Sequence, residues 1–105
     1  NMKQLKLRAW DTVDQKMIYN FEKTTHLEQY LQDPRYIVME QLVGIKTRLA
    51  QDVYDGDIIK WLSGALMVVS WINDPPSYSP FDGYLPQECE VVGNIHENPE
   101  MVKGK

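Results

Sequence analysis

The chain carries its strongest local signal at Asp55-Gly56, where a polar turn leads directly into a β-branched run. Gly56 tolerates a positive φ angle, and the Asp55 carboxylate can hydrogen-bond to nearby backbone amides, so this pair favours a tight turn. Ile58 and Ile59 are stiff at χ1 and suit a pleated strand. We therefore expect Asp55, Gly56 and Asp57 to form the turn that leads into the central strand of a small β-domain.

Alternation along this central strand separates its side chains into two sets. Ile59 and Trp61 share one face, whereas Ile58 and Lys60 share the other. Because the second set combines an apolar with a charged residue, we expect one buried face and one partly wet face.

The size and composition of the chain predict one globular domain. It has 105 residues, of which 43% are hydrophobic and 25% charged. A net charge of -4 disfavours binding of nucleic acid through a general positive field. Cys89 is the one cysteine, so no intrachain disulfide can form, and neither a signal peptide nor a spanning apolar segment is evident. We expect a cytoplasmic protein.

Several short elements are expected along the chain. Alternation predicts an N-terminal hairpin, and Thr25-His26-Leu27-Glu28 has the form of a capping box that would start one short helix before Pro34. Further strands are expected at residues 36–43, 65–72 and 90–95, a proline-rich loop at 73–83, and a helical turn at Asn98-Pro99. These elements favour a mainly β fold, either a small barrel or a curled antiparallel sheet. The hairpin and helix would occupy about residues 3–34, and the barrel about residues 36–97.

Several motifs resemble those of the YopX family. The opening LKLRAWD is similar to the family's (K/R)FRAWD, YDGDIIK at Tyr54 to "YEGDIVK", and EVVGNIHENPE at Glu90 to "EVIGNIYENPEL". The resemblance implies a small mainly β protein with an SH3-like barrel, encoded by phages or prophages in bacterial hosts. The family motifs define no catalytic residue. Family members usually have a longer span before the next strand, whereas only Leu62-Ser63-Gly64 separates Trp61 from Ala65 here.

Polar side chains offer little for catalysis. Asp55 and Asp57 could act as a metal-binding or acid–base pair, but turn formation explains them better. His26 and His96 have no third ligand at a spacing usable for zinc, and Glu88 and Glu90 would oppose a Cys89 thiolate. We expect no catalytic residue, no metal and no cofactor, and therefore a protein that is not an enzyme.

Aromatic side chains are the better functional lead. Trp10 and Tyr19 could pair on the outer side of the N-terminal hairpin, and Tyr78, Phe81 and Tyr84 crowd the proline-rich loop. They would either form a protein-contact surface, as aromatic grooves of SH3-like barrels do, or pack beneath the loop.

Two function classes follow. The first is a non-enzymatic module that contacts a host or phage protein or assembles with itself, since the first strand would be a long edge that needs covering. The alternative is a weak nucleic-acid-binding barrel. It would require convergence of five cationic side chains, namely Lys3, Lys6, Arg8, Lys46 and Arg48.

Overall fold

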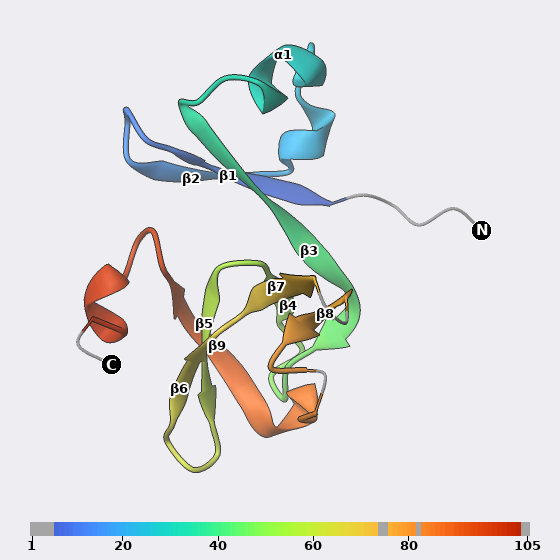
Figure 1. Cartoon of the computed structure of the whole chain (residues 1–105), viewed down its shortest axis with the longest axis vertical. Coiled ribbons are helices and arrows are strands. Elements are labelled where there is room, and N and C mark those ends of the chain that lie inside the picture. Colours follow the sequence, from blue (N-terminus) through green and yellow to red (C-terminus); the bar gives the residue numbers. More distant parts are fainter. Residues whose placement is uncertain (1–5, 74–75, 82, 104–105) are drawn as a thin grey trace. The chain divides into compact units, whose positions relative to one another are not determined.

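The computed structural model describes residues 6–73, 76–81 and 83–103 (Figure 1). By contacts between Cα atoms, the chain divides into two compact units, Asn1–Gln41 and Leu42–Lys105. The division falls inside strand β3, several residues after the expected end of the hairpin and helix. The elements are β1 (Leu7–Asp11), β2 (Lys16–Tyr19), η1 (Phe21–Lys23), α1 (Leu27–Leu31), β3 (Tyr36–Lys46), β4 (Asp52–Tyr54), β5 (Asp57–Trp61), β6 (Leu66–Val68), β7 (Ser70–Asn73), β8 (Pro76–Ser79), η2 (Pro86–Glu88), β9 (Cys89–Asn94) and η3 (Pro99–Met101).

The expected mainly β fold is confirmed, as are the N-terminal hairpin and the single short α-helix. The pairings β1–β2, β1–β3, β5–β6, β5–β9 and β7–β8 are antiparallel. The sheets run in the orders β2-β1-β3-β4, β6-β5-β9 and β7-β8. The described strands do not close into a barrel, so the curled-sheet alternative fits better than the SH3-like barrel.

In the first unit, β1 is a central strand. Ala9 faces Ile18 on β2 and Val38 on β3, which pair with opposite edges of β1. The expectation of an exposed first-strand edge is therefore wrong, because β3 covers the side of β1 that the hairpin leaves open. Leu7, Ala9 and Phe21 form a small buried cluster on one face of this sheet.

The short helix starts differently from the prediction. His26, in the left-handed region at φ 60°, occupies the N-cap position, and no side chain caps the helix. The capping box at Thr25 and Glu28 is thus not formed. Packing holds the helix instead, since Leu27 contacts the buried cluster and the Tyr30 ring lies edge-on to Phe21 at 6.2 Å.

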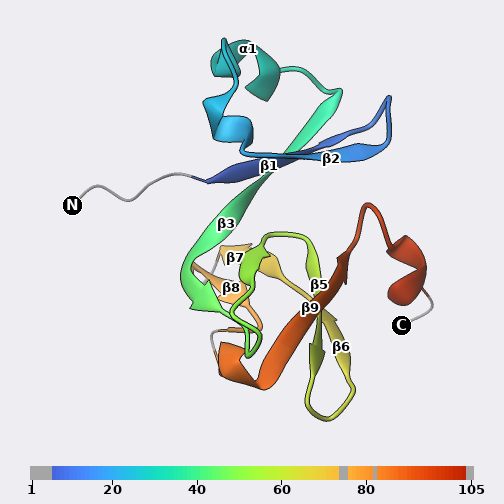
Figure 2. The same cartoon turned by 180° about the vertical axis from the view of Figure 1, so that it is seen from behind.

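In the second unit, β5 is the central strand of the β6-β5-β9 sheet (Figure 2). The turn before it forms as expected, with Gly56 at φ 90°. Ile58 and Ile59 are both fully buried, so the expected partly wet face of β5 is covered at this point. Leu42, Val53, Ile59, Val69 and Cys89 make up the buried core of this unit.

Three strand boundaries differ from the sequence prediction. Strand β3 continues through Gly44, which has φ 78°, to Lys46. The expected strand at residues 65–72 splits at Val69 into β6 and β7, which belong to different sheets. Part of the expected loop at 73–83 is strand β8, because Pro76 lies at the strand's first position, where a missing N–H is tolerated.

The short connection after β5 forms a tight hairpin. The backbone N–H of Trp61 donates to the Ala65 carbonyl at 3.0 Å, and the backbone N–H of Gly64 donates to the Trp61 carbonyl at 2.8 Å. Gly64 adopts φ 94°, which the turn requires and which a residue with a Cβ rarely adopts. The four residues between β5 and β6 are therefore sufficient to reverse the chain.

Candidate functional site

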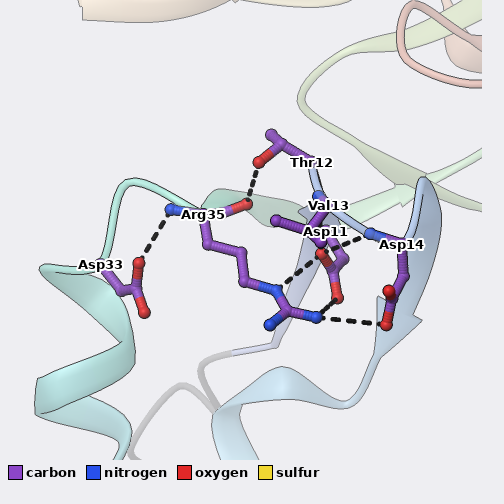
Figure 3. Close-up of polar contacts among 6 residues, drawn as sticks. All are labelled: Asp11, Thr12, Val13, Asp14, Asp33 and Arg35. Atoms are coloured by element: carbon purple, nitrogen blue, oxygen red, sulfur yellow. Dashed lines mark hydrogen bonds and ion pairs between the residues drawn. The ribbon is translucent and has the colours of Figure 1, made fainter.

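The most elaborate polar cluster lies in the first unit and centres on buried Asp11 (Figure 3). Arg35 donates from Nε to Asp11 Oδ1 and from Nη2 to Asp11 Oδ2, each at 2.9 Å. The backbone amides of Val13 and Asp14 donate to the same carboxylate. The cluster fixes the β1–β2 turn to the start of β3.

The electrostatics of this cluster indicate a structural role. The Arg35 hydrogen bonds hold the pKa of the Asp11 carboxyl far below its usual range, although burial alone would raise it. The same hydrogen bonds raise the pKa of Arg35. A carboxylate with all these donors is a poor general base, because its affinity for a proton is low.

The turn residues have the geometry of a turn rather than of an acid–base pair. Asp57 is buried, and its Oδ2 accepts the Tyr54 N–H at 2.7 Å across the turn. Asp55 is half-buried at the turn itself. Within residues 6–73, 76–81 and 83–103, no three His, Cys, Asp or Glu side chains gather as a metal site would require.

The candidate nucleophile Cys89 and the candidate bases His26 and His96 lie in separate parts of the fold. Cys89 is fully buried, its Sγ lies 3.3 Å from the Pro86 carbonyl, and burial followed by the Glu90 charge raises its pKa. His26 is exposed at the start of α1. The backbone N–H of His96 donates to Asn94 Oδ1 in a turn. A buried thiol with a raised pKa carries little thiolate and is a weak nucleophile.

The structure separates the five aromatic candidates. Tyr78 and Phe81 are half-buried and pack against the core of the second unit. Trp10 faces Met17 and Tyr19 faces Arg8, so the two aromatics share a face of the hairpin but are diagonal neighbours. Tyr84 is the most exposed of the five, at 59%.

Tyr84 borders an apolar groove of about 470 Å³ in the second unit. Its ring lies 5.4 Å from the ring of Trp61, with the planes tilted by 45°. Phe81 supports Trp61 from 6.2 Å in an edge-on arrangement. The groove is lined by the end of β5, the hairpin after it, β6 and the segment before β9; its lining includes Trp61, Leu62, Ala65, Met67, Tyr84 and Glu88.

Sequence reasoning identified Tyr84 but missed its partners in this groove. Alternation alone places Trp61 on the buried face of the central strand, whereas the structure has it at the strand's last position, beside an exposed turn. The exposed residues Leu62, at 71%, and Leu85, at 61%, flank the groove segments. The sequence signal for this groove is the pair of apolar residues in two short connections, Leu62 after β5 and Leu85 before η2.

Three of the five cationic residues are buried or ion-paired, whereas Lys6 is exposed. Arg8 is buried, Lys46 pairs with Asp52, and Arg48 Nη2 lies 2.9 Å from Glu90 Oε2. Lys3 lies outside the described residues. These contacts lend no support to a nucleic-acid surface, and that alternative stays a prediction. No helix in the described ranges has the length and apolar character needed to cross a membrane.

Comparison with known proteins defines the class of the chain. The structure resembles the crystal structure of protein EF1440 from Enterococcus faecalis, with a TM-score of 0.71 and 17% identity over 97% of this chain and 100% of that chain. The family described as YopX protein matches residues 20–103. The chain therefore belongs to the YopX family. No curated protein matches it.

Proposed function

We propose that the protein is a non-enzymatic interaction module of phage or prophage origin that contacts a protein in the bacterial cytoplasm. The contact surface is the groove between Trp61 and Tyr84. The exposed apolar groove is the observation that carries this proposal, since such surfaces commonly mark sites of protein contact.

The composition of the groove supports protein contact. Tyr and Trp supply large, rigid contact area and are frequent in the centres of interfaces. Met67, at 38% exposure, adds an adaptable apolar side chain beside the two rings. The candidate polar groups elsewhere, Asp11 and Cys89, are buried and contribute to the stability of the fold.

The proposal is tested by capture from a lysate of phage-infected or prophage-carrying bacteria, with and without nuclease. Tyr84→Ser removes a groove ring, and Tyr19→Ser removes a similarly exposed ring from the other unit (59% and 52%). A bound protein that survives nuclease, is retained by Tyr19→Ser and is lost with Tyr84→Ser supports the proposal. Capture that is lost on nuclease treatment, or that Tyr84→Ser leaves unchanged, contradicts it.

Self-assembly is the second form that the interaction could take. Sedimentation equilibrium of the purified chain separates it from contact with another protein. A dimer that Tyr84→Ser dissociates would make the groove a self-contact, whereas a monomer would leave the groove to a different partner.

A further inference from the structure

We infer that the groove accepts an extended basic peptide segment, which adds to the outer edge of β6 and places an arginine side chain beside Trp61, Tyr84 and Glu88. This inference rests on the proposed function, because it names the chemistry of the partner at the same groove. Three features of the second unit support it: a strand edge, an aromatic pair and one carboxylate.

The edge of β6 is the first feature. Strand β6 is the last strand of the β6-β5-β9 sheet. The backbone N–H of Trp61 donates to the Ala65 carbonyl, and the backbone N–H of Val69 donates to the Asp57 carbonyl. The antiparallel alternation then turns the backbone groups of Leu66 and Val68 away from β5. No described strand pairs with that side, so an added strand could hydrogen-bond there.

The aromatic pair is the second feature. Trp61 and Met67 lie on the same face of the sheet, because Met67 faces Ile59 and side chains alternate along β5. A strand added to β6 would lie about 10 Å from β5, at the usual strand spacing. A long side chain from it would cross Met67 and end at the Trp61 and Tyr84 rings. The outer faces of this ring pair can attract a cation that comes within about 6 Å of a ring centroid, and guanidinium also stacks on such faces.

The charge of the groove is the third feature. Among the described residues, Glu88 is the one charged residue that lines it. Its side chain is exposed and has no ion pair within the described ranges of the chain. Lys60 alternates to the other face of β5, where Glu90 is its partner on β9. A carboxylate beside two rings complements a guanidinium, which can bond to it through two parallel N–H donors.

Capped peptides provide the test. The probes are Gly-Thr-Val-Arg-Val-Thr-Gly and the same peptide with glutamine in place of arginine, titrated into the ¹⁵N-labelled protein. We expect the arginine peptide to move the Trp61 indole signal and the amides of Leu66 and Val68. Its dissociation constant should be about tenfold lower than that of the glutamine peptide. Glu88→Gln should remove most of this preference, whereas Glu90→Gln, which changes the net charge equally, should keep it.

Equal binding of the two peptides, no binding of either, or a preference unchanged by Glu88→Gln would overturn the inference. Two further outcomes distinguish failure of this inference from failure of the proposed function. If Tyr84→Ser abolishes equal binding of both peptides, the groove is a contact site without arginine selectivity. If partner capture ignores Tyr84, the groove is not the contact site, and the proposed function fails first.

Discussion

The two units achieve stability by different means. The first has a small apolar cluster of Leu7, Ala9 and Phe21 and adds an ion pair between buried Asp11 and partly exposed Arg35. The second has a larger cluster around fully buried Ile59, and its ion pairs Lys46–Asp52 and Arg48–Glu90 lie at partly exposed positions. Where few apolar side chains are available, directional polar contacts must hold the strands together.

The comparison also shows where the chain can carry a site. In the first unit, the Asp11 carboxylate and the Glu22 carboxylate, which accepts the Leu7 N–H at 2.8 Å, are committed to backbone and side-chain donors. In the second unit, the apolar core leaves Trp61 and Tyr84 at an open groove. The structural role and the proposed contact role therefore lie in different units of the chain.

The largest expected effect is on the apolar core of the second unit. Ile59→Ala removes a fully buried side chain and should lower the free energy of unfolding by about 4 kcal/mol. Ile37→Ala, at a position that is 42% exposed in the first unit, should cost about 1 kcal/mol or less. Urea denaturation compares the two variants. Equal losses would mean that burial does not distinguish the two positions.

The next effect concerns the polar anchor of the first unit. Asp11→Asn leaves the Arg35 guanidinium without its buried counter-charge and should lower the melting temperature by roughly 10 °C. Asp14→Asn, at an exposed residue 3.1 Å from the same guanidinium, serves as the control and should change it little. Amide exchange should accelerate in β1 and β2 before β5. Uniform acceleration across both units would contradict separate anchoring.

A crowded glycine gives a smaller effect in the second unit. A Cβ at Gly93 would lie 2.6 Å from Asn98 Oδ1, which accepts the Asn94 N–H, so Gly93→Ala should cost about 2 kcal/mol. Gly83→Ala meets no atom within 4 Å and should be nearly neutral. Thermal unfolding of both variants checks this. Equal melting temperatures would show that the C-terminal turn adapts without cost.

Acid should weaken the first unit through Asp11. The folded pKa of this carboxyl is held below its ordinary value of 3.8, so its contribution is fully present above that pH. The contribution is lost as the pH falls from about 4 toward the lowered pKa. The melting temperature of Asp11→Asn should therefore depend less on pH in this range than that of the wild type. Parallel pH profiles would contradict the assignment.

The smallest effect on stability is expected in the groove. Tyr84 is 59% exposed, so Tyr84→Ser should change the free energy of unfolding by no more than about 0.5 kcal/mol while it removes partner binding. Calorimetry with the purified partner measures the second quantity. Loss of binding accompanied by unfolding would assign Tyr84 to the core instead.

Local patterns predicted much of the fold and little of the groove. The Asp55-Gly56 turn, the N-terminal hairpin and the turn at Pro99 follow from turn chemistry and alternation. The break at Val69 could not be read from a continuous apolar run, because sheet pairing decides where such a run divides. Trp61 and Tyr84 are far apart in the sequence, and only the fold brings their rings together.

The capping box failed for a related reason. Thr25 and Glu28 have the required spacing, but His26 adopts a left-handed conformation and the helix starts one residue later. The contacts of Leu27 and Tyr30 with the Phe21 cluster set the position of this five-residue helix. Tertiary packing thus overrides a local signal in a short helix.

The most direct test of the separation of roles is chemical-shift mapping of the ¹⁵N-labelled protein with the purified partner. We expect the perturbed signals to gather at residues 61–67 and 84–88, and the signals of the β1–β2 hairpin around Trp10 and Tyr19 to remain unchanged. Perturbations centred on that hairpin would contradict it and place the contact surface on the first unit.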